Sequence, residues 1–374
     1  MKNCFCILTV AHPFDDVRVY RKMALSIVKE LDVIWIGPDF HFFESKLNED
    51  GIHWDLYKNR KGLTGRVLNN FTAIRQFRKY RKSISFVYIP DPDMAFFFTL
   101  FVRTRRIRKI FDIHEVYHKY LLQHHVGGII SKFLNNILQK VINRTVSNVD
   151  LTIAVSGTVS DYYVSGANRN LVIRNCLPLS FADIKENSVS DKKSFTVVHG
   201  KNHPTRGTMY ILEAIRILKE KRINFKVLMI NTKSEVFDEY VKKYELESYI
   251  DLHDGLPFTE MLNQMHRCHA GLIAYGRDLG VDSLPNRIFE YMALGLPVIV
   301  PWYSTEMFKI VEKEKCGLVT DTEDPAKIAE CIEELAGNFQ LSKEMGERGR
   351  KAFLKQHNWE AEIMPFIEYL KNQK

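Results

Sequence analysis

The chain has 374 residues, of which 45% are hydrophobic and 26% charged, and its formal net charge is +8. This length exceeds one ordinary domain, and the composition excludes a disordered chain. Six cysteines without a C-x-x-C pair indicate neither a zinc site nor a disulfide framework, and they suit a reducing cytoplasm. No signal peptide is recognised, and the longest apolar run, residues 94–102, is about half of a bilayer span.

The positive charge is concentrated in the first half of the chain. Residues 1–150 hold 24 Lys and Arg against 14 Asp and Glu, a net charge of +10, whereas residues 151–374 hold 29 against 31, a net charge of −2. This asymmetry predicts an anionic partner for the first half, and a membrane surface, a phosphorylated acceptor and nucleic acid all fit.

The first half alternates strand-like apolar runs with segments of helical periodicity. The expected strands are residues 4–10, 31–36, 86–89, 109–112 and 151–155. The expected helices are residues 19–31, 67–81, 93–102 and 129–147. This alternation predicts a parallel sheet with helices on both faces.

A polar stretch without periodicity predicts a linker over residues 181–193, after which the α/β pattern restarts. The expected strands are residues 194–199, 224–230, 249–252, 271–275 and 298–300. The expected helices are residues 210–221, 234–244, 258–268, 285–294, 304–313, 325–337 and 342–353. We therefore expect two domains, residues 1–180 and 194–355, whose sheets face each other across a cleft, and a C-terminal helix within residues 356–374 that packs back on the first domain.

Residues 281–300 place two acids, Asp282 and Glu290, around a short apolar helix. Pro285 suits the first helical turn because its missing N–H is not needed there. The other backbone N–H groups around Leu284–Arg287 would be free, and the helix dipole there favours a phosphate. Glu290 lies one turn further among apolar residues, where a carboxylate needs hydrogen-bond donors such as the two hydroxyls of a ribose. The alternative is an ordinary helix in which Glu290 is exposed or pairs with a nearby arginine.

The start of the second domain places two cations in a loop between a strand and a helix. Lys201 follows Gly200 at the end of the strand, and Arg206 precedes Gly207 five residues later. Both side chains could reach one anion, although loop cations are more often solvated. The stretch contains neither Gly-x-Gly-x-x-Gly nor a P-loop, which excludes the dinucleotide and P-loop interpretations.

Two strand ends in the first half carry further candidates. The segments VAHPFDDVRVY, residues 10–20, and FDIHEVY, residues 111–117, each follow or end an expected strand. Ligands of α/β domains bind at the carboxyl ends of strands. His114 could hold a substrate hydroxyl, with a structural histidine as the alternative, and a plain connection is the alternative for residues 10–20.

Together these motifs resemble the retaining nucleotide-sugar glycosyltransferases of family 4, whose GT-B fold has two Rossmann-like domains. Asp282 and Glu290 stand where that family carries Glu-x7-Glu, and LPNRIFEYMALGLPVI is close to the sequence that the family usually has there. Gly200-Lys201 and Arg206-Gly207 stand where the family usually has Gly-Arg and Lys-Gly; FDIHE, HPFDDVR and IRNCLP match further segments. The chain departs from the pattern in its first acid, in the exchanged basic pair and in Pro13-Phe14, where the family has Gly-Gly.

The resemblance implies transfer of a sugar from a UDP- or GDP-sugar to a hydroxyl of a lipid-linked or cell-surface polysaccharide precursor. The anomeric configuration would be retained, without a metal or other cofactor. Residues 1–180 would lie on the acceptor side and residues 194–355 would bind the donor. The implied catalytic residues are Lys201 and Arg206, which neutralise the diphosphate, and His114 and Asp282, which hold sugar hydroxyls. The implied donor-binding residues are Gly200, Phe14, Glu290, Leu284, Pro285, Asn286 and Arg287.

Other functions and partners fit parts of the sequence. The basic amphipathic segment 63–81 and the cationic residues 104–109 suit a peripheral anchor on the inner face of an anionic membrane, with a solvated charged helix as the alternative. A sugar-nucleotide epimerase of the same fold is an alternative enzyme. A non-enzymatic nucleic-acid-binding protein would fit the pI of about 9.0, but no recognised binding motif supports nucleic acid as a partner.

Overall fold

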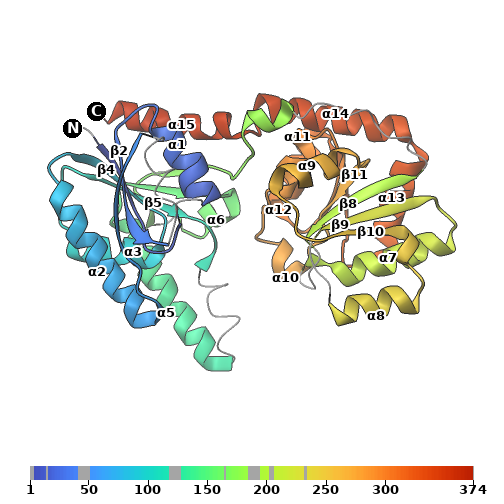
Figure 1. The fold of residues 1–374 in the computed structure, drawn as a ribbon, viewed down its shortest axis with the longest axis horizontal. Helices are drawn as coiled ribbons and strands as arrows, with labels where there is room; N and C mark the ends of the chain where they lie inside the picture. The colour runs from blue at the N-terminus through green and yellow to red at the C-terminus, as the bar shows by residue number, and fades with distance from the viewer. Residues whose placement is uncertain are drawn as a thin grey trace. The chain divides into compact units, whose positions relative to one another are not determined.

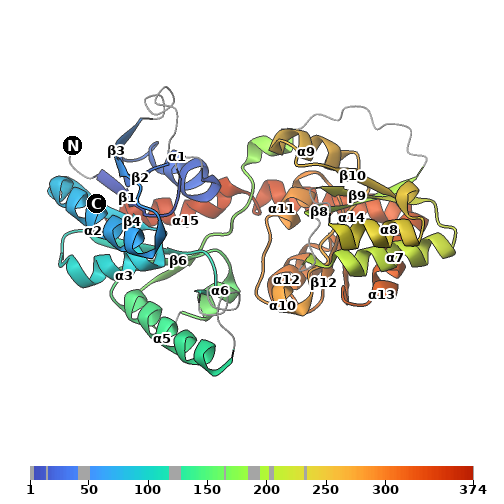
Figure 2. The same cartoon turned by 60° about the horizontal axis from the view of Figure 1, so that its bottom comes forward.

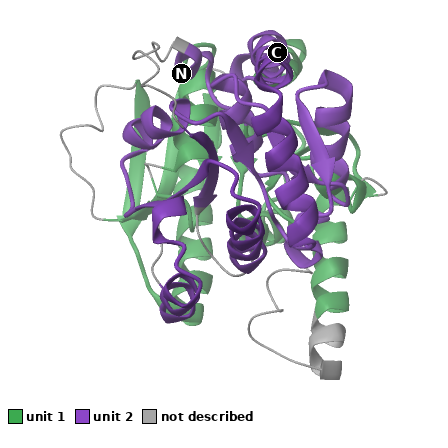
Figure 3. Cartoon of the chain, turned by 90° about the vertical axis from the view of Figure 1, so that its right-hand side faces the viewer, with its two compact units in different colours: residues 1–175, 362–374 green, residues 176–361 purple. Residues whose placement is uncertain are grey.

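The computed structural model of the protein describes residues 4–13, 16–40, 51–117, 128–163, 166–183, 194–201, 206–230 and 234–373. The chain divides into two compact units (Figure 3). Unit 1 comprises Met1–Asn175 and Glu362–Lys374, and unit 2 comprises Cys176–Ala361. Most of the predicted linker lies outside the described residues, and its first three residues end a 3₁₀ turn, Leu179–Asp183.

Unit 1 is built on a parallel sheet with the strand order β3-β2-β1-β4-β5-β6-β7 among its described residues. The strands are β1 Cys4–Leu8, β2 Val33–Asp39, β3 Ile52–Lys58, β4 Ile84–Ile89, β5 Arg108–Ile113, β6 Leu151–Ala154 and β7 Asn170–Val172. The helices are a π-helical segment η1 Val17–Ala24, α1 Leu25–Ile27, α2 Gly62–Tyr80, α3 Pro92–Phe101, α5 Gly128–Ser147, α6 Gly157–Asp161 and the C-terminal part of α15 Trp359–Asn372.

Helices cover both faces of this sheet because alternate residues of a strand point to opposite sides. On one face, Cys4, Cys6 and Leu8 of β1 join one apolar cluster with residues of α2, α3 and α5 (Figure 1). On the other face, Phe5 of β1 packs edge-on against Phe366 of α15, with ring centroids 6.1 Å apart. The sheet is therefore buried on both sides, as a doubly wound domain requires.

Unit 2 repeats the design with the strand order β10-β9-β8-β11-β12-β13, again parallel throughout. The strands are β8 Phe195–Lys201, β9 Phe225–Ile230, β10 Ile250–His253, β11 Ala270–Leu272, β12 Val298–Pro301 and β13 Gly317–Thr320. The helices are α7 Thr208–Glu220, α8 Glu235–Lys243, α9 Phe258–His266, α10 Arg277–Gly280, α11 Arg287–Ala293, α12 Thr305–Glu314, α13 Pro325–Gly337, α14 Phe339–Lys355 and the start of α15, with a 3₁₀ turn at Glu247–Tyr249.

The helices of unit 2 also divide between two faces. Apolar residues of α9, α11, α12 and α14 share one cluster with β8, β9 and β12, whereas those of α7, α8 and α13 share a second cluster on the opposite side. Helices α7 and α8 lie side by side in both views (Figures 1 and 2).

Each sheet has one place where the direction of strand addition reverses. In unit 1 the chain adds β2 and β3 on one side of β1 and then continues with β4 on the other side. In unit 2 it adds β9 and β10 on one side of β8 and then β11 on the other. The carboxyl ends of strands at such a switch point are the usual ligand-binding position in open α/β sheets.

The predicted fold class, an α/β protein with two parallel-sheet halves, is confirmed. The sequence analysis missed strands β3, β7 and β13, which carry partly exposed residues at or beside the sheet edges. The helix predicted over residues 19–31 is present with other bounds: Val17–Ala24 is π-helical and Leu25–Ile27 is α-helical. Here Asp16 begins the helix early: its side chain accepts hydrogen bonds from the backbone N–H groups of Arg18 and Val19.

Candidate functional site

The switch point of unit 2 lies at the carboxyl ends of β8 and β11, where several predicted site residues meet. Strand β8 ends with His199, Gly200 and Lys201, and its register with β9 shifts between His199 and Lys201, so Gly200 forms a bulge. Strand β11 continues into Ala274 and Tyr275, which are buried. The backbone therefore bends at the point where a ligand would approach.

Arg287 covers Gly200. A Cβ atom built on Gly200 would lie 2.6 Å from Nε and 2.9 Å from Nη2 of Arg287, so only glycine allows this approach. Helix α11 holds the arginine there: the Tyr291 hydroxyl donates to the Val198 carbonyl at 3.2 Å, and its ring occupies the space above Gly271. Arg287 stands one helical turn before Tyr291, so the packing of Tyr291 places the guanidinium of Arg287 directly on the bulge.

Glu290 is buried, at 6% exposure, and pairs with Arg287 across 3.2 Å between Oε2 and Nη1. The guanidinium also donates to the thioether sulfurs of Met261 and Met265, each at 3.3 Å. The buried acid predicted from the sequence is therefore present, and so is the arginine partner of the alternative interpretation. The carboxylate therefore lies beside the bulge, held by the guanidinium of Arg287.

Arg206 approaches the same edge from the loop before α7. Its Cζ lies 5.6 Å from the centre of the Tyr275 ring, a cation–π distance. The following residue, Gly207, has φ +79°, and a Cβ atom there would lie 1.7 Å from the carbonyl oxygen of Ala274. Glycine at this position lets α7 start against the end of β11 and sets the direction from which Arg206 enters.

The pKa values of His199 and Tyr275 reflect the charges at this edge of the sheet. Burial, together with the positive charges of Arg287 and Arg206, lowers the pKa of His199 to about 4, although the hydrogen bond to the Leu272 carbonyl acts in the opposite direction. Burial raises the pKa of Tyr275; the charges of Arg206 and Arg287 lower it, and the charge of Glu290 raises it. The two guanidinium groups therefore act on one small region, and that region favours an anion.

Helix α11 is shorter than the helix predicted over residues 285–294. Helix α11 begins at Arg287 rather than Pro285, and the Ile288 N–H donates to the Pro285 carbonyl. The N–H groups of Asn286 and Arg287 have no acceptor within the described parts of the chain. Leu284, Pro285, Asn286 and Asp282 are all partly exposed. Two free N–H groups remain, but a seven-residue helix supplies less dipole than the predicted one.

Three predicted residues are not joined to this arrangement by any described contact. Lys201 ends β8, directly after the bulge, but only its backbone is described. Phe14 lies outside the described residues. His114 belongs to unit 1, where it follows β5.

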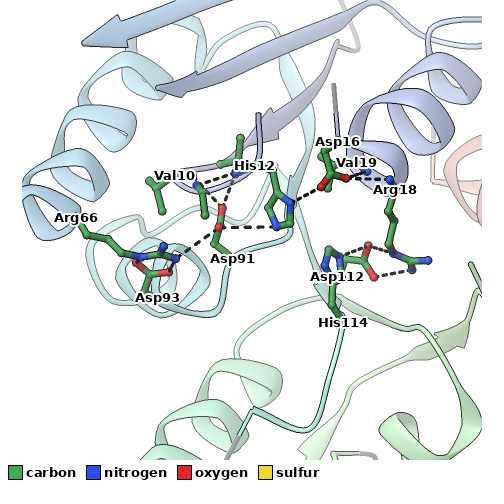
Figure 4. A network of polar contacts seen from close by, with 12 residues as sticks. Val10, His12, Asp16, Arg18, Val19, Arg66, Asp91, Asp93, Asp112 and His114 are labelled. Atoms are coloured by element: carbon green, nitrogen blue, oxygen red, sulfur yellow. Dashed lines mark hydrogen bonds and ion pairs between the residues drawn. The ribbon is translucent and has the colours of Figure 1, made fainter. Parts of the chain in front are cut away.

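Asp112 is the centre of a buried polar cluster at the switch point of unit 1 (Figure 4). Arg18 donates to both of its oxygens at 2.9 and 2.8 Å, and the Tyr88 hydroxyl donates as well. His114 Nε2 lies 3.1 Å from the same carboxylate. Burial opposes ionisation, but the charges of Arg18 and His114 hold the pKa of Asp112 well below its usual range.

His12 forms the second part of this cluster. Its Nδ1 lies 3.1 Å from Asp16 and its Nε2 lies 3.9 Å from Asp91, and its ring stacks edge-on with His114 at 5.2 Å. Burial lowers the pKa of His12, but the hydrogen bond with Asp16 and the charge of Asp91 outweigh it, so the pKa is raised overall. Asp91 is itself fixed by the Thr9 hydroxyl at 2.6 Å and the Val10 N–H at 2.8 Å.

Sequence reasoning missed several of these residues. Only the backbone of Arg287 was predicted to act, and His199 and Tyr275 were not singled out. In unit 1, His12, Asp91 and Asp112 stand at the ends of three strands, a position that the strand predictions themselves indicated. The i, i+4 spacing of His12 and Asp16 was a further signal.

The described residues contain no group of three or more His, Cys, Asp and Glu that could hold a metal ion. Among the helices that the structure describes, none combines the length and apolar character needed to cross a bilayer.

Comparison with known proteins agrees with the fold. An uncharacterized glycosyltransferase of Methanocaldococcus jannaschii is 29% identical over 171 residues, which are 46% of this chain and 46% of that protein. The chain thus matches less than half the length of this relative. Among solved structures, HepE of Anabaena in complex with UDP has a TM-score of 0.75 at 13% identity, covering 100% of both chains. A sucrose-phosphate synthase of Thermosynechococcus elongatus has a TM-score of 0.72 at 13% identity, covering 100% of this chain and 99% of that one.

HepE has also been solved in complex with UDP-glucose. The family model of glycosyl transferases group 1 matches residues 180–352, the part of the chain that holds Arg206, Arg287 and Glu290. The chain therefore has the GT-B fold, and its residues 180–352 are similar to the glycosyl transferases group 1 family.

Proposed function

We propose that the protein is a retaining glycosyltransferase of family 4 that uses a UDP- or GDP-sugar and transfers the sugar to a hydroxyl group. The acceptor would be a lipid-linked or cell-surface polysaccharide precursor. One observation carries the proposal: two guanidinium groups lie at the carboxyl ends of β8 and β11, that of Arg287 on the bulge at Gly200 and that of Arg206 near the ring of Tyr275, and both charges act on His199. Paired cations at the carboxyl edge of a switch point suit the diphosphate of a nucleotide sugar.

In the proposed reaction, negative charge develops on the leaving diphosphate. The bond between the anomeric carbon and the diphosphate oxygen breaks, and its electron pair stays with the diphosphate. The acceptor oxygen bonds to the anomeric carbon on the same face, and its proton passes to the leaving diphosphate. Arg206 and Arg287, with Lys201 as a further cation, neutralise the charge that develops; such stabilisation is often the largest single catalytic contribution. In this proposal the cations take the part of a metal ion, and no metal is required.

The other site residues hold the donor in place. Glu290, which the guanidinium of Arg287 holds in place, would accept hydrogen bonds from the ribose hydroxyls. The free N–H groups of Asn286 and Arg287 would donate to the phosphates, beside Leu284 and Pro285. Asp282 and His114 keep the roles implied by the family resemblance, hydrogen bonds to sugar hydroxyls.

Two measurements test the proposal. Thermal melting with UDP, GDP, ADP and CDP should show that UDP or GDP stabilises the protein, also in the presence of a chelator. The sugar nucleotides of the best binder should then be hydrolysed slowly, and Arg206→Ala and Arg287→Ala should abolish both effects. Protection by none of the four nucleotides would refute the proposal, and an altered free nucleotide sugar formed without acceptor would favour the epimerase instead.

A further inference from the structure

Helices α2 and α3 of unit 1 expose a continuous row of large apolar side chains. These side chains, which we call the apolar ridge, are Leu63, Val67, Leu68, Phe71, Leu100 and Phe101. Leu63 is 88% exposed and the other five are between 42% and 52% exposed. Phe71 contacts Phe101 with ring centroids 5.4 Å apart, so the two helices form one surface. Scattered exposed apolar residues are ordinary, but a contiguous row indicates a partner.

A strongly cationic groove of about 1190 Å³ adjoins the apolar ridge. Its exposed cations, which define the cationic groove, are Arg81, Lys82, Arg103, Arg105, Arg106 and Arg144. No carboxylate lines the groove, and none of the described acids forms an ion pair with these six side chains. Leu100 belongs both to the ridge and to the lining of the groove, so the two surfaces are continuous.

The groove is distinct from the polar cluster of unit 1. It is lined by Ile84 at the start of β4 and Lys109 near the start of β5, whereas His12, Asp91 and His114 follow the opposite ends of the strands. The ridge runs along α2 between these two edges. Near the N-terminus of α2, at the end away from the groove, Arg66 pairs with Asp93 at 2.7 Å and approaches Asp91 at 3.6 Å.

We propose that the apolar ridge and the cationic groove dock unit 1 on an anionic phospholipid surface. Lipid phosphates would occupy the groove while ridge side chains enter the upper acyl region. Nucleic acid would satisfy the arginines but would leave Leu63, Val67 and Leu100 in water. A second copy of the chain would bring one set of unpaired cations against another. An anionic bilayer fits both halves of the surface, and this inference does not depend on the proposed enzymatic activity.

Sedimentation of the full chain with vesicles tests the proposal. The protein should bind vesicles that contain phosphatidylglycerol, bind phosphatidylcholine vesicles weakly, and be released from the former by high salt. Each arginine near an anionic surface contributes about a fivefold change in partitioning, so Arg105→Ala with Arg106→Ala should weaken binding about 25-fold. The matched control is Lys309→Ala with Lys351→Ala, which removes equal charge from exposed positions of unit 2 and should leave binding unchanged.

The apolar half is tested separately. Leu63→Ser, at the most exposed position of the ridge, should weaken vesicle binding about tenfold with no change in Tm, because the side chain makes no core contact to lose. The proposal fails if the wild type ignores phosphatidylglycerol, or if both variants bind like the wild type. It also fails if heparin or inorganic phosphate binds in place of vesicles while Leu63→Ser has no effect, since the groove would then hold a soluble anion.

Discussion

Replacement of Glu290 by glutamine removes a buried negative charge and keeps its shape. Glu290 lies 3.2 Å from Arg287, and their side chains are 7% and 17% exposed. Breaking a buried ion pair costs about 3–5 kcal/mol. Glutamine still offers one oxygen to the guanidinium, so we expect the lower end, about 3 kcal/mol.

This loss converts into a measurable change of melting temperature. For a folding unit of this size, each kcal/mol shifts Tm by about 2–4 °C, so the Tm of unit 2 should fall by about 6–12 °C. Contact with the ribose adds a separate effect, because a hydrogen bond to a charged group contributes about 1.5–3 kcal/mol. The Kd of the preferred nucleoside diphosphate should therefore rise by about 10- to 150-fold.

Calorimetric melting and isothermal titration of Glu290→Gln measure the two effects independently. Glu306→Gln is the matched control, since Glu306 is also buried in unit 2, at 7% exposure, but lies outside the candidate site. Its nucleotide affinity should equal that of the wild type. A lower Tm with unchanged nucleotide affinity would show that Glu290 serves only Arg287 and would refute the ribose contact. An unchanged Tm would refute the buried pair.

Four further predictions follow from single contacts. Gly200→Ala places a Cβ atom 2.6 Å from Nε of Arg287, a flexible side chain that can move, so nucleotide affinity measured by titration should fall at least about tenfold while Tm changes little; equal affinity would contradict the role of Arg287. Gly207→Ala combines φ +79° with a 1.7 Å clash against the Ala274 backbone and should lower Tm strongly, whereas Gly337→Ala, with nothing within 4 Å, should not. His199 binds its proton near pH 4 when folded and near 6.5 when unfolded, so it contributes stability that is present above pH 6.5 and is lost as the pH falls toward 4, by about 3 kcal/mol in full; denaturant titrations should show a shallower loss in His199→Gln, and identical pH profiles would argue against a buried neutral imidazole. Asp112→Asn leaves Arg18 without its carboxylate and should destabilise unit 1 by about 3–5 kcal/mol in denaturant unfolding, with a near-wild-type midpoint as the contradicting result.

The sequence predicted the fold better at the buried strands than at the sheet edges. Central strands such as Cys4–Leu8 are apolar throughout because both of their faces are covered, and this pattern is readable without a structure. Edge strand Gly317–Thr320 is only partly buried and short, so its pattern resembles a loop. The π-helical start at Val17 depends on hydrogen bonds that the Asp16 side chain accepts from backbone N–H groups, and apolar periodicity does not encode them.

Some residues of the candidate site could likewise be predicted from the sequence, and others could not. Glu290 was recognisable because an acid among apolar residues requires a partner, and Gly200 and Arg206 because they stand between a strand and a helix. The approach of Arg287 to Gly200 was not predictable, since it depends on how Tyr291 packs on β8 and β11. The cluster around Asp112 draws on Arg18 and Tyr88 from separate elements, and only the sheet order brings these residues together.

The most direct test of the central claim is a crystal structure of the protein with its preferred nucleoside diphosphate. We predict that the diphosphate lies within hydrogen-bond distance of both guanidinium groups, Arg206 and Arg287, beside the backbone of Gly200, with the ribose hydroxyls on Glu290. A nucleotide bound at any other place, with these three side chains out of its reach, would contradict the account.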